Sequence, residues 1–94
     1  MTLRRAARID ANQPEIVAAL RKAGALVEII GQPVDLLVGI RGQFMLMEIK
    51  DGKKVKSAQE LTAAQKAFFA KWAGYPHSVV DGVDAALRAI GVVK

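Results

Sequence analysis

The stretch DLLVGIRGQFMLMEIK, residues 35–50, decides the fold that this chain is expected to adopt. Two apolar runs, Leu36–Ile40 and Phe44–Ile49, flank the segment Arg41-Gly42-Gln43, and this pattern predicts a β-hairpin. Both runs are almost continuously apolar. We therefore expect strands that are covered on both faces, with helices on at least one side.

Three charged residues interrupt this apolar ribbon. Side chains alternate between the two faces of a strand, so Glu48 and Lys50 are expected to point the same way. In a hairpin of simple register, Asp35 lies across from the end of the second strand. The three charged groups then meet at one edge of a buried sheet, where charges are costly unless they pair or bind an ion.

The composition is that of one small domain. The 94 residues are 52% hydrophobic and 24% charged, which is enough apolar material for one modest core. The formal net charge of +5 weakly favours a polyanionic partner, and the lack of cysteine excludes disulfides and thiolate metal sites. No apolar run reaches membrane-spanning length and no signal-like segment begins the chain. We therefore expect an intracellular, cytoplasmic protein with no membrane partner.

The first part of the chain predicts a basic arm, a helix and a short strand. Residues 1–11 form the arm, in which Arg8 is a candidate phosphate contact; a solvated arm is the alternative. The helix is expected to begin near Asn12, with Glu15 in the pattern of a capping box. Glu15 is open to two interpretations, as a helix cap or as a side chain that reaches toward the charged cluster. Ala25–Ile30 predicts the strand.

A lysine-rich segment, residues 51–60, follows the hairpin directly. It has little apolar content and predicts a loop, for which a solvated linker is the simplest interpretation. Its lysines are expected beside the charged cluster, where a phosphate backbone would be bound. The candidate contacts to nucleic acid are Lys53, Lys54, Lys56, Arg41 and Arg8.

A second helix is predicted from Thr62 to about Ala73, with Thr62 and Gln65 in the capping-box pattern. Gln65 lies on the apolar stripe of this helix, where a polar amide needs hydrogen-bond partners. Capping explains the residue type, and orientation toward the charged cluster explains its position; both stay open. Trp72 is expected in the core rather than stacked on a nucleobase. The expected buried stripe consists of Leu61, Phe68, Phe69 and Trp72.

The last part of the chain predicts a strand, His77–Val80, and a final helix. His77 is the only histidine, so an edge-strand residue is expected there rather than a zinc ligand. Asp81 is expected to cap the final helix and Gly91 to end it. The order α-β-β-β-α-β-α predicts an α/β fold, with a small mixed sheet flanked by helices in one domain of residues 1–94.

The charged cluster has the composition of a metal site for phosphoryl chemistry. Mg²⁺ is typically held by one or two carboxylates, together with substrate phosphate and water. Asp35 and Glu48 supply such ligands, and the main-chain carbonyl of Ile49 lies between them and Lys50. Lys50 could orient or help deprotonate an attacking water, or stabilise charge on phosphorus. A structural ion-pair network is the alternative, because an Asp followed by Glu-x-Lys occurs by chance.

The residues of the charged cluster resemble those of a known family. Asp35 with Glu48-Ile49-Lys50 is similar to the active-site signature of the PD-(D/E)xK nuclease superfamily. The chain as a whole resembles the small stand-alone VRR-NUC domains, virus-type replication-repair nucleases of phages and bacteria. Family members usually have Pro directly before the Asp, whereas Pro33 stands one residue earlier. The segments that carry the resemblance are Asp10-Ala-Asn-Gln-Pro-Glu15-Ile-Val, Asp35-Leu-Leu-Val-Gly-Ile-Arg-Gly, Glu48-Ile-Lys-Asp-Gly-Lys, Leu61-Thr-x-x-Gln65 and Val79–Leu87.

The resemblance implies a restriction-endonuclease-like core and a structure-selective DNA endonuclease that depends on Mg²⁺ or Mn²⁺. It implies that the metal ligands are Asp35, Glu48, the Ile49 carbonyl and Glu15, and that Lys50 and Gln65 complete the catalytic set. Stand-alone members are similar to Holliday-junction resolvases, so a homodimer that acts on branched or four-way DNA is expected.

Two other hypotheses stay open. One is a non-catalytic DNA-binding or assembly module on the same fold, and the other is a general or RNA-directed nuclease. A degenerate module is expected to lose the Glu or the Lys of the cluster. This chain retains both Glu48 and Lys50, which favours an enzyme.

Overall fold

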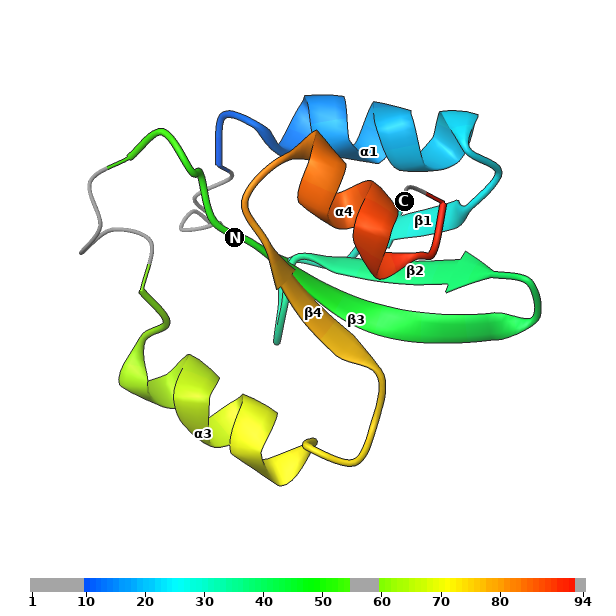
Figure 1. Ribbon diagram of the computed structural model, residues 1–94. Helices are drawn as coiled ribbons and strands as arrows, with labels where there is room; N and C mark the ends of the chain where they lie inside the picture. Colours follow the sequence, from blue (N-terminus) through cyan, green and yellow to red (C-terminus); the bar gives the residue numbers. More distant parts are fainter. Residues whose placement is uncertain (1–9, 55–59, 93–94) are drawn as a thin grey trace, which may run out of the picture.

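The elements of the fold follow one another in the predicted order, α-β-β-β-α-β-α (Figure 1). The computed structural model describes residues 10–54 and 60–92. The predicted α/β class, a small mixed sheet flanked by helices, is confirmed. No helix in these ranges combines the length and the apolar character needed to cross a membrane. The helices and strands are α1 (Gln13–Lys22), β1 (Leu26–Ile29), β2 (Leu36–Ile40), β3 (Gln43–Ile49), α3 (Ala63–Lys71), β4 (His77–Val80) and α4 (Val83–Ala89).

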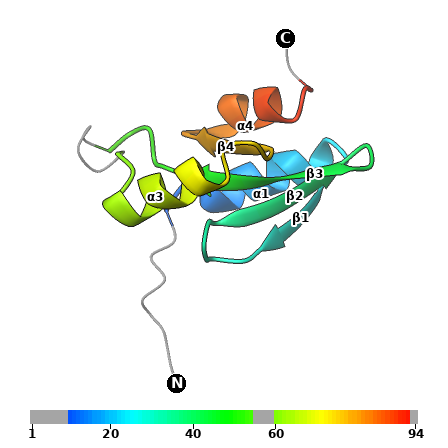
Figure 2. The ribbon, with the colours of Figure 1, turned by 90° about the horizontal axis from the view of Figure 1, so that it is seen from below.

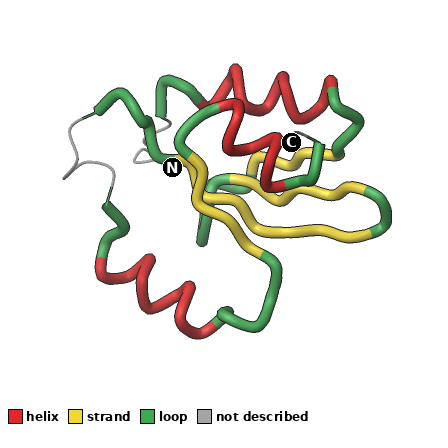
Figure 3. The backbone as a smooth tube through the Cα atoms, in the orientation of Figure 1, coloured by secondary structure: helices red, strands yellow, loops and turns green. Residues whose placement is uncertain are grey.

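The strands form one sheet in the order β1-β2-β3-β4 (Figure 3). β1, β2 and β3 pair antiparallel, whereas β4 runs parallel to β3, and α3 lies on the crossover that this parallel pairing requires. The hairpin turn consists of Arg41 and Gly42, both with positive φ (52° and 79°), as tight two-residue hairpins require. The short turn fixes the register in which Leu36 pairs with Met47.

One face of the sheet forms the core together with α1 and α4, which lie over it (Figure 2). Alternate residues of β2 and β3 point into this layer, as the period of a strand requires. Removal of these side chains from water is the main contribution to stability. The most buried residues of the layer are Ile16, Leu20, Leu36, Val38, Met47, Ile49, Ala86 and Ile90.

Helices cover one face of the sheet, as expected, but the expectation that the strands are covered on both faces is wrong, because the described residues leave the other face largely exposed. In the described part of the chain, only α3 lies on that side, toward the β4 end of the sheet (Figure 1). Leu26 of β1 is 77% exposed and Phe44 of β3 is 72% exposed. Together with Leu37 they line a shallow hollow of about 470 Å³. Burial within residues 10–54 and 60–92 therefore does not explain all the apolar residues of the hairpin.

Two predicted helix caps are wrong. Asn12 stands at the N-cap of α1 but makes no capping bond; its Nδ2 donates to the carbonyl oxygen of Asp81 at 3.2 Å. Asp81 does not cap α4, whose N-cap residue is Gly82. The side chain of Asn12 thus binds a distant segment of the chain, and α4 begins one residue later than predicted. Gly91, with a φ of 81°, ends α4 as predicted.

The predicted buried stripe of α3 is correct only in part. Phe69 is 8% exposed, but Trp72 is 36% exposed, and Phe68 and Leu61 are half-buried. The reason is that α3 packs on the sheet through Phe69, whose ring stacks on His77 with 4.8 Å between the centroids. His77 begins β4 at the edge of the sheet, as predicted.

Candidate active site

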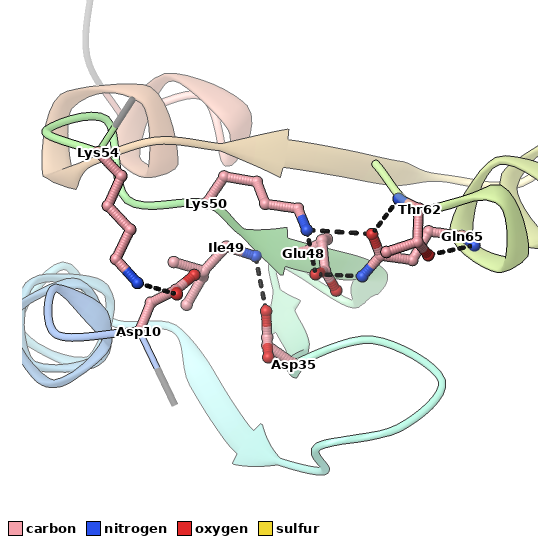
Figure 4. Close-up of polar contacts among 8 residues, drawn as sticks. All are labelled: Asp10, Asp35, Glu48, Ile49, Lys50, Lys54, Thr62 and Gln65. Carbon is pink, nitrogen blue, oxygen red and sulfur yellow. Dashed lines mark hydrogen bonds and ion pairs between the residues drawn. The ribbon is translucent and has the colours of Figure 1, made fainter. Parts of the chain in front are cut away.

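The register of the hairpin brings the predicted charged residues together at one end of the sheet (Figure 4). Leu36 pairs with Met47, so the next residues outward, Asp35 and Glu48, face each other across β2 and β3. Lys50 follows two residues after Glu48, and its Nζ lies 3.7 Å from Glu48 Oε2. Because Met47 points into the core, Glu48 points to the face that α1 and α4 leave open.

The main chain holds the carboxylate of Asp35 in place. Its Oδ2 accepts a hydrogen bond from the N–H of Ile49 at 2.7 Å. The main-chain carbonyl oxygen of Asp35 accepts two more hydrogen bonds, at 2.9 and 3.1 Å, from backbone N–H groups in the turn between β1 and β2. This turn contains a cis peptide bond before Pro33, and Val34 is buried directly before Asp35. These hydrogen bonds keep Asp35 against β3 although the proline stands one residue early.

Gln65 of α3 connects the carboxylate to the ammonium group. Its Nε2 donates to Glu48 Oε2 at 2.7 Å, and its Oε1 accepts from Lys50 Nζ at 3.0 Å (Figure 4). The same Oε1 accepts from the N–H of Thr62 at 3.0 Å, while Thr62 Oγ1 accepts from the N–H of Gln65 at 3.1 Å. The predicted capping box is therefore confirmed, and Gln65 serves both as a cap and as a partner of the cluster.

The surroundings of Glu48 oppose its ionisation. Burial first, and then the negative charge of Asp35, raise the pKa of Glu48 from 4.5 to about 7, although Lys50 and Gln65 act in the opposite direction. Burial also raises the pKa of Asp35, against the hydrogen bond from the Ile49 N–H, and the charge of Asp10 adds to the rise. Two carboxylates that resist ionisation beside each other are typical of functional sites.

The donor set fits a divalent cation that prefers oxygen ligands. Asp35 and Glu48 offer carboxylates whose mutual repulsion a cation would relieve. In a strand, the N–H and C=O of one residue point to the same side, so the Ile49 carbonyl faces Asp35 as its N–H does. Within residues 10–54 and 60–92, no three acidic, His or Cys side chains are arranged around one point. Such a site therefore needs the carbonyl, with water and phosphate, as Mg²⁺ sites commonly do.

Glu15 within α1 and Asp10 before it differ in their relation to the cluster. Glu15 is exposed in the first turn of α1, where its negative charge interacts favourably with the helix dipole. Within the described residues it makes no hydrogen bond or ion pair with the cluster. Its role at a metal-bound water stays a prediction. Asp10, which has no predicted role, lies closer: its charge acts on Asp35, and its Oδ1 is 3.7 Å from Lys54 Nζ (Figure 4). The resemblance segment that begins at Asp10 was the signal that could have identified it.

The predicted contacts to nucleic acid fall into three groups. Lys53 and Lys54 are exposed in the loop that leaves β3 beside the cluster. Arg41 lies at the opposite end of the hairpin, where its guanidinium donates to the carbonyl at the C-cap of α4 at 2.6 Å. The structure therefore gives Arg41 a contact of its own, away from the cluster. Lys56 and Arg8 lie outside the described residues.

The start of this loop is anchored to the segment after β4. The N–H of Gly52 donates to the carbonyl of Asp81 at 3.3 Å, and a Cβ on Gly52 would lie 3.1 Å from the same oxygen. Asp51 Oδ1 accepts from the N–H of Lys53 at 2.9 Å. A side chain at position 52 would require the Asp81 segment to shift by a few tenths of an ångström, so glycine suits this close approach at the start of the loop.

Comparison of the chain with models of protein families, with curated proteins and with solved structures gives no match. The function is therefore inferred from the charged cluster and from the motifs described above. The fold limits the possibilities, but many unrelated functions share one fold, so the chemistry of the site has to decide.

Proposed function

We propose that this protein is an endonuclease that hydrolyses phosphodiester bonds of DNA and depends on a divalent metal ion. The observation that carries the proposal is the meeting of Asp35 and Glu48 in a half-buried cluster that raises the pKa of both carboxyl groups. A structural ion-pair network explains this poorly, because the single ammonium of Lys50 cannot neutralise two carboxylates, and an uncompensated buried charge destabilises a fold.

Each residue of the cluster has a distinct role in this proposal. Asp35 and Glu48 bind Mg²⁺ or Mn²⁺, with the carbonyl of Ile49 as the third protein ligand. When bound, such an ion polarises the scissile phosphodiester and lowers the pKa of a coordinated water. Lys50 orients the attacking water or stabilises the negative charge that builds on the phosphate. Gln65 holds Glu48 and Lys50 in position through its two hydrogen bonds.

The proposed substrate is branched DNA, in particular a four-way junction. The net charge of +5 and the exposed Lys53 and Lys54 beside the cluster support a polyanionic partner. The preference for a junction comes from the resemblance to stand-alone VRR-NUC domains. Symmetric cleavage of a four-way junction needs two active sites, so the protein is proposed to act as a homodimer.

The open face of the sheet is the surface that we propose for this dimer. Leu26 and Phe44 give it an apolar centre, and the hollow that they line also contains Arg21 and Glu28. A two-fold axis brings the basic side of one copy to the acidic side of the other, as in an isologous contact. Replacement of Phe44 by Asp is expected to halve the mass measured by light scattering. An unchanged dimer would reject this surface.

The central experiment is the incubation of a labelled four-way junction with Mg²⁺ or Mn²⁺, beside linear duplex and flap controls. The wild-type protein is expected to cut the junction, whereas Glu48→Ala and Lys50→Ala abolish cleavage. Both variants still bind the junction when the ion is chelated. Glu60→Ala is the matched control, because it removes an exposed glutamate outside the cluster. Cleavage by both Glu48→Ala and Lys50→Ala at the wild-type rate would refute the proposal.

The same experiment separates the alternatives. Symmetric paired nicks support a junction resolvase, and cutting of every DNA or RNA substrate at one rate supports a general nuclease. Binding of the junction by the wild-type protein, without cleavage in either ion, supports a non-catalytic DNA-binding or assembly module.

A further inference from the structure

A series of touching aromatic rings leads from the sheet to the molecular surface along α3. The ring of Phe69 stacks on His77, and Phe68 contacts Phe69 at 5.3 Å between centroids. Phe68 also lies 5.9 Å from the ring of Trp72, which meets Tyr75 edge-on at 5.1 Å. We call these five residues the aromatic ladder. Ring pairs at such distances hold each other in defined orientations.

The two ends of the aromatic ladder differ in exposure. Phe69 anchors the inner end and is almost completely buried, whereas Trp72 and Tyr75 at the outer end are 36% and 62% exposed. Neither outer side chain makes a hydrogen bond to the described part of the chain. The outer rings are thus supported from behind and leave aromatic surface open to a ligand.

The charge of α3 suits a polyanion. The helix contains no acidic residue, and its Lys66 and Lys71 are exposed. Neither lysine forms an ion pair within the ranges that the structure describes. Exposed aromatic rings among positive charges are the combination that binds single-stranded nucleic acid, because bases stack on the rings while lysines contact the phosphates.

We propose that Trp72 and Tyr75 form a stacking site for unpaired nucleobases of the DNA substrate. This inference rests on the proposed nuclease function and refines its substrate: branched DNA in which bases near the cut are unpaired, as in a flap or at a junction whose branch point is opened. Gln65 touches Glu48, and Trp72 follows seven residues later, about 10 Å along the helix axis. That length corresponds to about three stacked nucleotides at ~3.4 Å each. Bases within an intact duplex are already stacked and offer no free face to these rings.

The test uses Trp72 as its own reporter, because it is the only tryptophan of the chain. The full-length protein, in a chelator that prevents cleavage, is titrated with oligothymidylate and with a blunt duplex of equal nucleotide content. Single strands are expected to quench the tryptophan fluorescence strongly, and the duplex only weakly. In anisotropy titrations with labelled oligothymidylate, Trp72→Ala and Tyr75→Ala are each expected to lower the affinity about 5- to 100-fold.

Matched variants separate stacking from a structural role of the rings. Trp72→Phe keeps an aromatic face and is expected to retain most of the affinity, as is Val92→Ala, which shortens an exposed apolar side chain beyond α4. Thermal melting of each variant verifies that α3 is still folded. Equal quenching by duplex and single strand, or wild-type affinity in a folded Tyr75→Ala variant, overturns the proposal. Because binding is measured without a metal ion, quenching by a protein that never cuts DNA would reject the nuclease and retain this site.

Discussion

The two ends of the β2–β3 hairpin both carry charged side chains with hydrogen-bond partners, but their charges relate differently to the fold. At the turn, the guanidinium of Arg41 donates to the carbonyl of Ile90 at 2.6 Å and so satisfies the C-terminal end of α4. At the other end, Asp35 and Glu48 lie together with raised pKa values. Loss of Arg41 leaves a helix end without its partner, whereas loss of Glu48 relieves a repulsion.

We interpret this difference as that between a charge that the fold needs and charges that serve the proposed metal site. The fold explains Arg41 completely, because the residue completes a hydrogen bond that the helix needs. The fold does not explain why two carboxylates should approach each other beside a single ammonium. Local conflicts with the rules of stable packing are expected mainly at functional sites. We therefore expect substitutions at the two ends of the hairpin to differ in their effects on stability and on cleavage.

The largest effect is expected from Glu48→Gln, which keeps the shape of the side chain and removes its charge. Cleavage is expected to fall at least ~100-fold, the usual loss when a group that acts on the reacting atoms is removed. The free energy of unfolding, measured with urea in a chelator, is expected to stay the same or to rise. A large loss of stability would instead identify the cluster as a structural network.

The pH dependence of stability gives the second effect. Because the pKa of Glu48 is about 7 in the folded protein and 4.5 in the unfolded chain, the folded state binds a proton more tightly between these values. Stability therefore falls as the pH rises from about 4.5 to 7, by as much as ~3 kcal/mol, and Asp35 contributes in the same direction. Urea denaturation at pH 5 and pH 8 in a chelator measures this fall.

The same experiment with Mg²⁺ sharpens the comparison. A cation at the cluster binds the ionised carboxylates and competes with protons, so Mg²⁺ is expected to raise the melting temperature more at pH 8 than at pH 5. In Glu48→Gln, both the pH dependence and the effect of Mg²⁺ are expected to diminish. If Mg²⁺ does not change the melting temperature at any pH, there is no metal site at this end of the hairpin.

Arg41→Gln is the third test and addresses the other end. The variant is expected to lose about 1.5–3 kcal/mol of unfolding free energy, the usual contribution of a hydrogen bond with a charged donor. Cleavage and DNA affinity are expected to stay at the wild-type level, since Arg41 lies away from the cluster. If DNA affinity falls while stability does not, the original prediction of Arg41 as a DNA contact is correct.

The sequence predicted the features that depend on neighbouring residues. The hairpin and the meeting of Asp35 with Glu48 follow from strand alternation on both sides of a short turn, although Gln43, which was expected in the turn, is the first residue of β3. The capping box of Thr62 and Gln65 is likewise a pattern over four residues. The amide of Gln65 also contacts the cluster, which its place on a helix stripe and the resemblance to the nuclease family both indicate.

Features that depend on distant segments could not be predicted. Asn12 bonds to Asp81, 69 residues away, and no local rule weighs such a contact against a helix cap. The exposure of Leu26 and Phe44 also could not be predicted. The apolar sequence pattern of a strand is the same whether helices of its own chain or a second molecule cover the strand. Trp72 lies on the apolar stripe of a predicted helix, and such a stripe does not show which of its residues reach the sheet.

The smallest expected effect concerns the lysines beside the cluster. Lys53→Ala is expected to weaken DNA binding several-fold for all sequences and to reduce the slope of log affinity against log salt concentration by about 1. Lys54→Ala is expected to do less, because the charge of Lys54 is already 3.7 Å from Asp10. Lys22→Ala, in the last turn of α1, is the control for a lysine away from the cluster. Equal salt slopes for Lys53→Ala and Lys22→Ala would show that the charged end of the hairpin does not hold the DNA backbone.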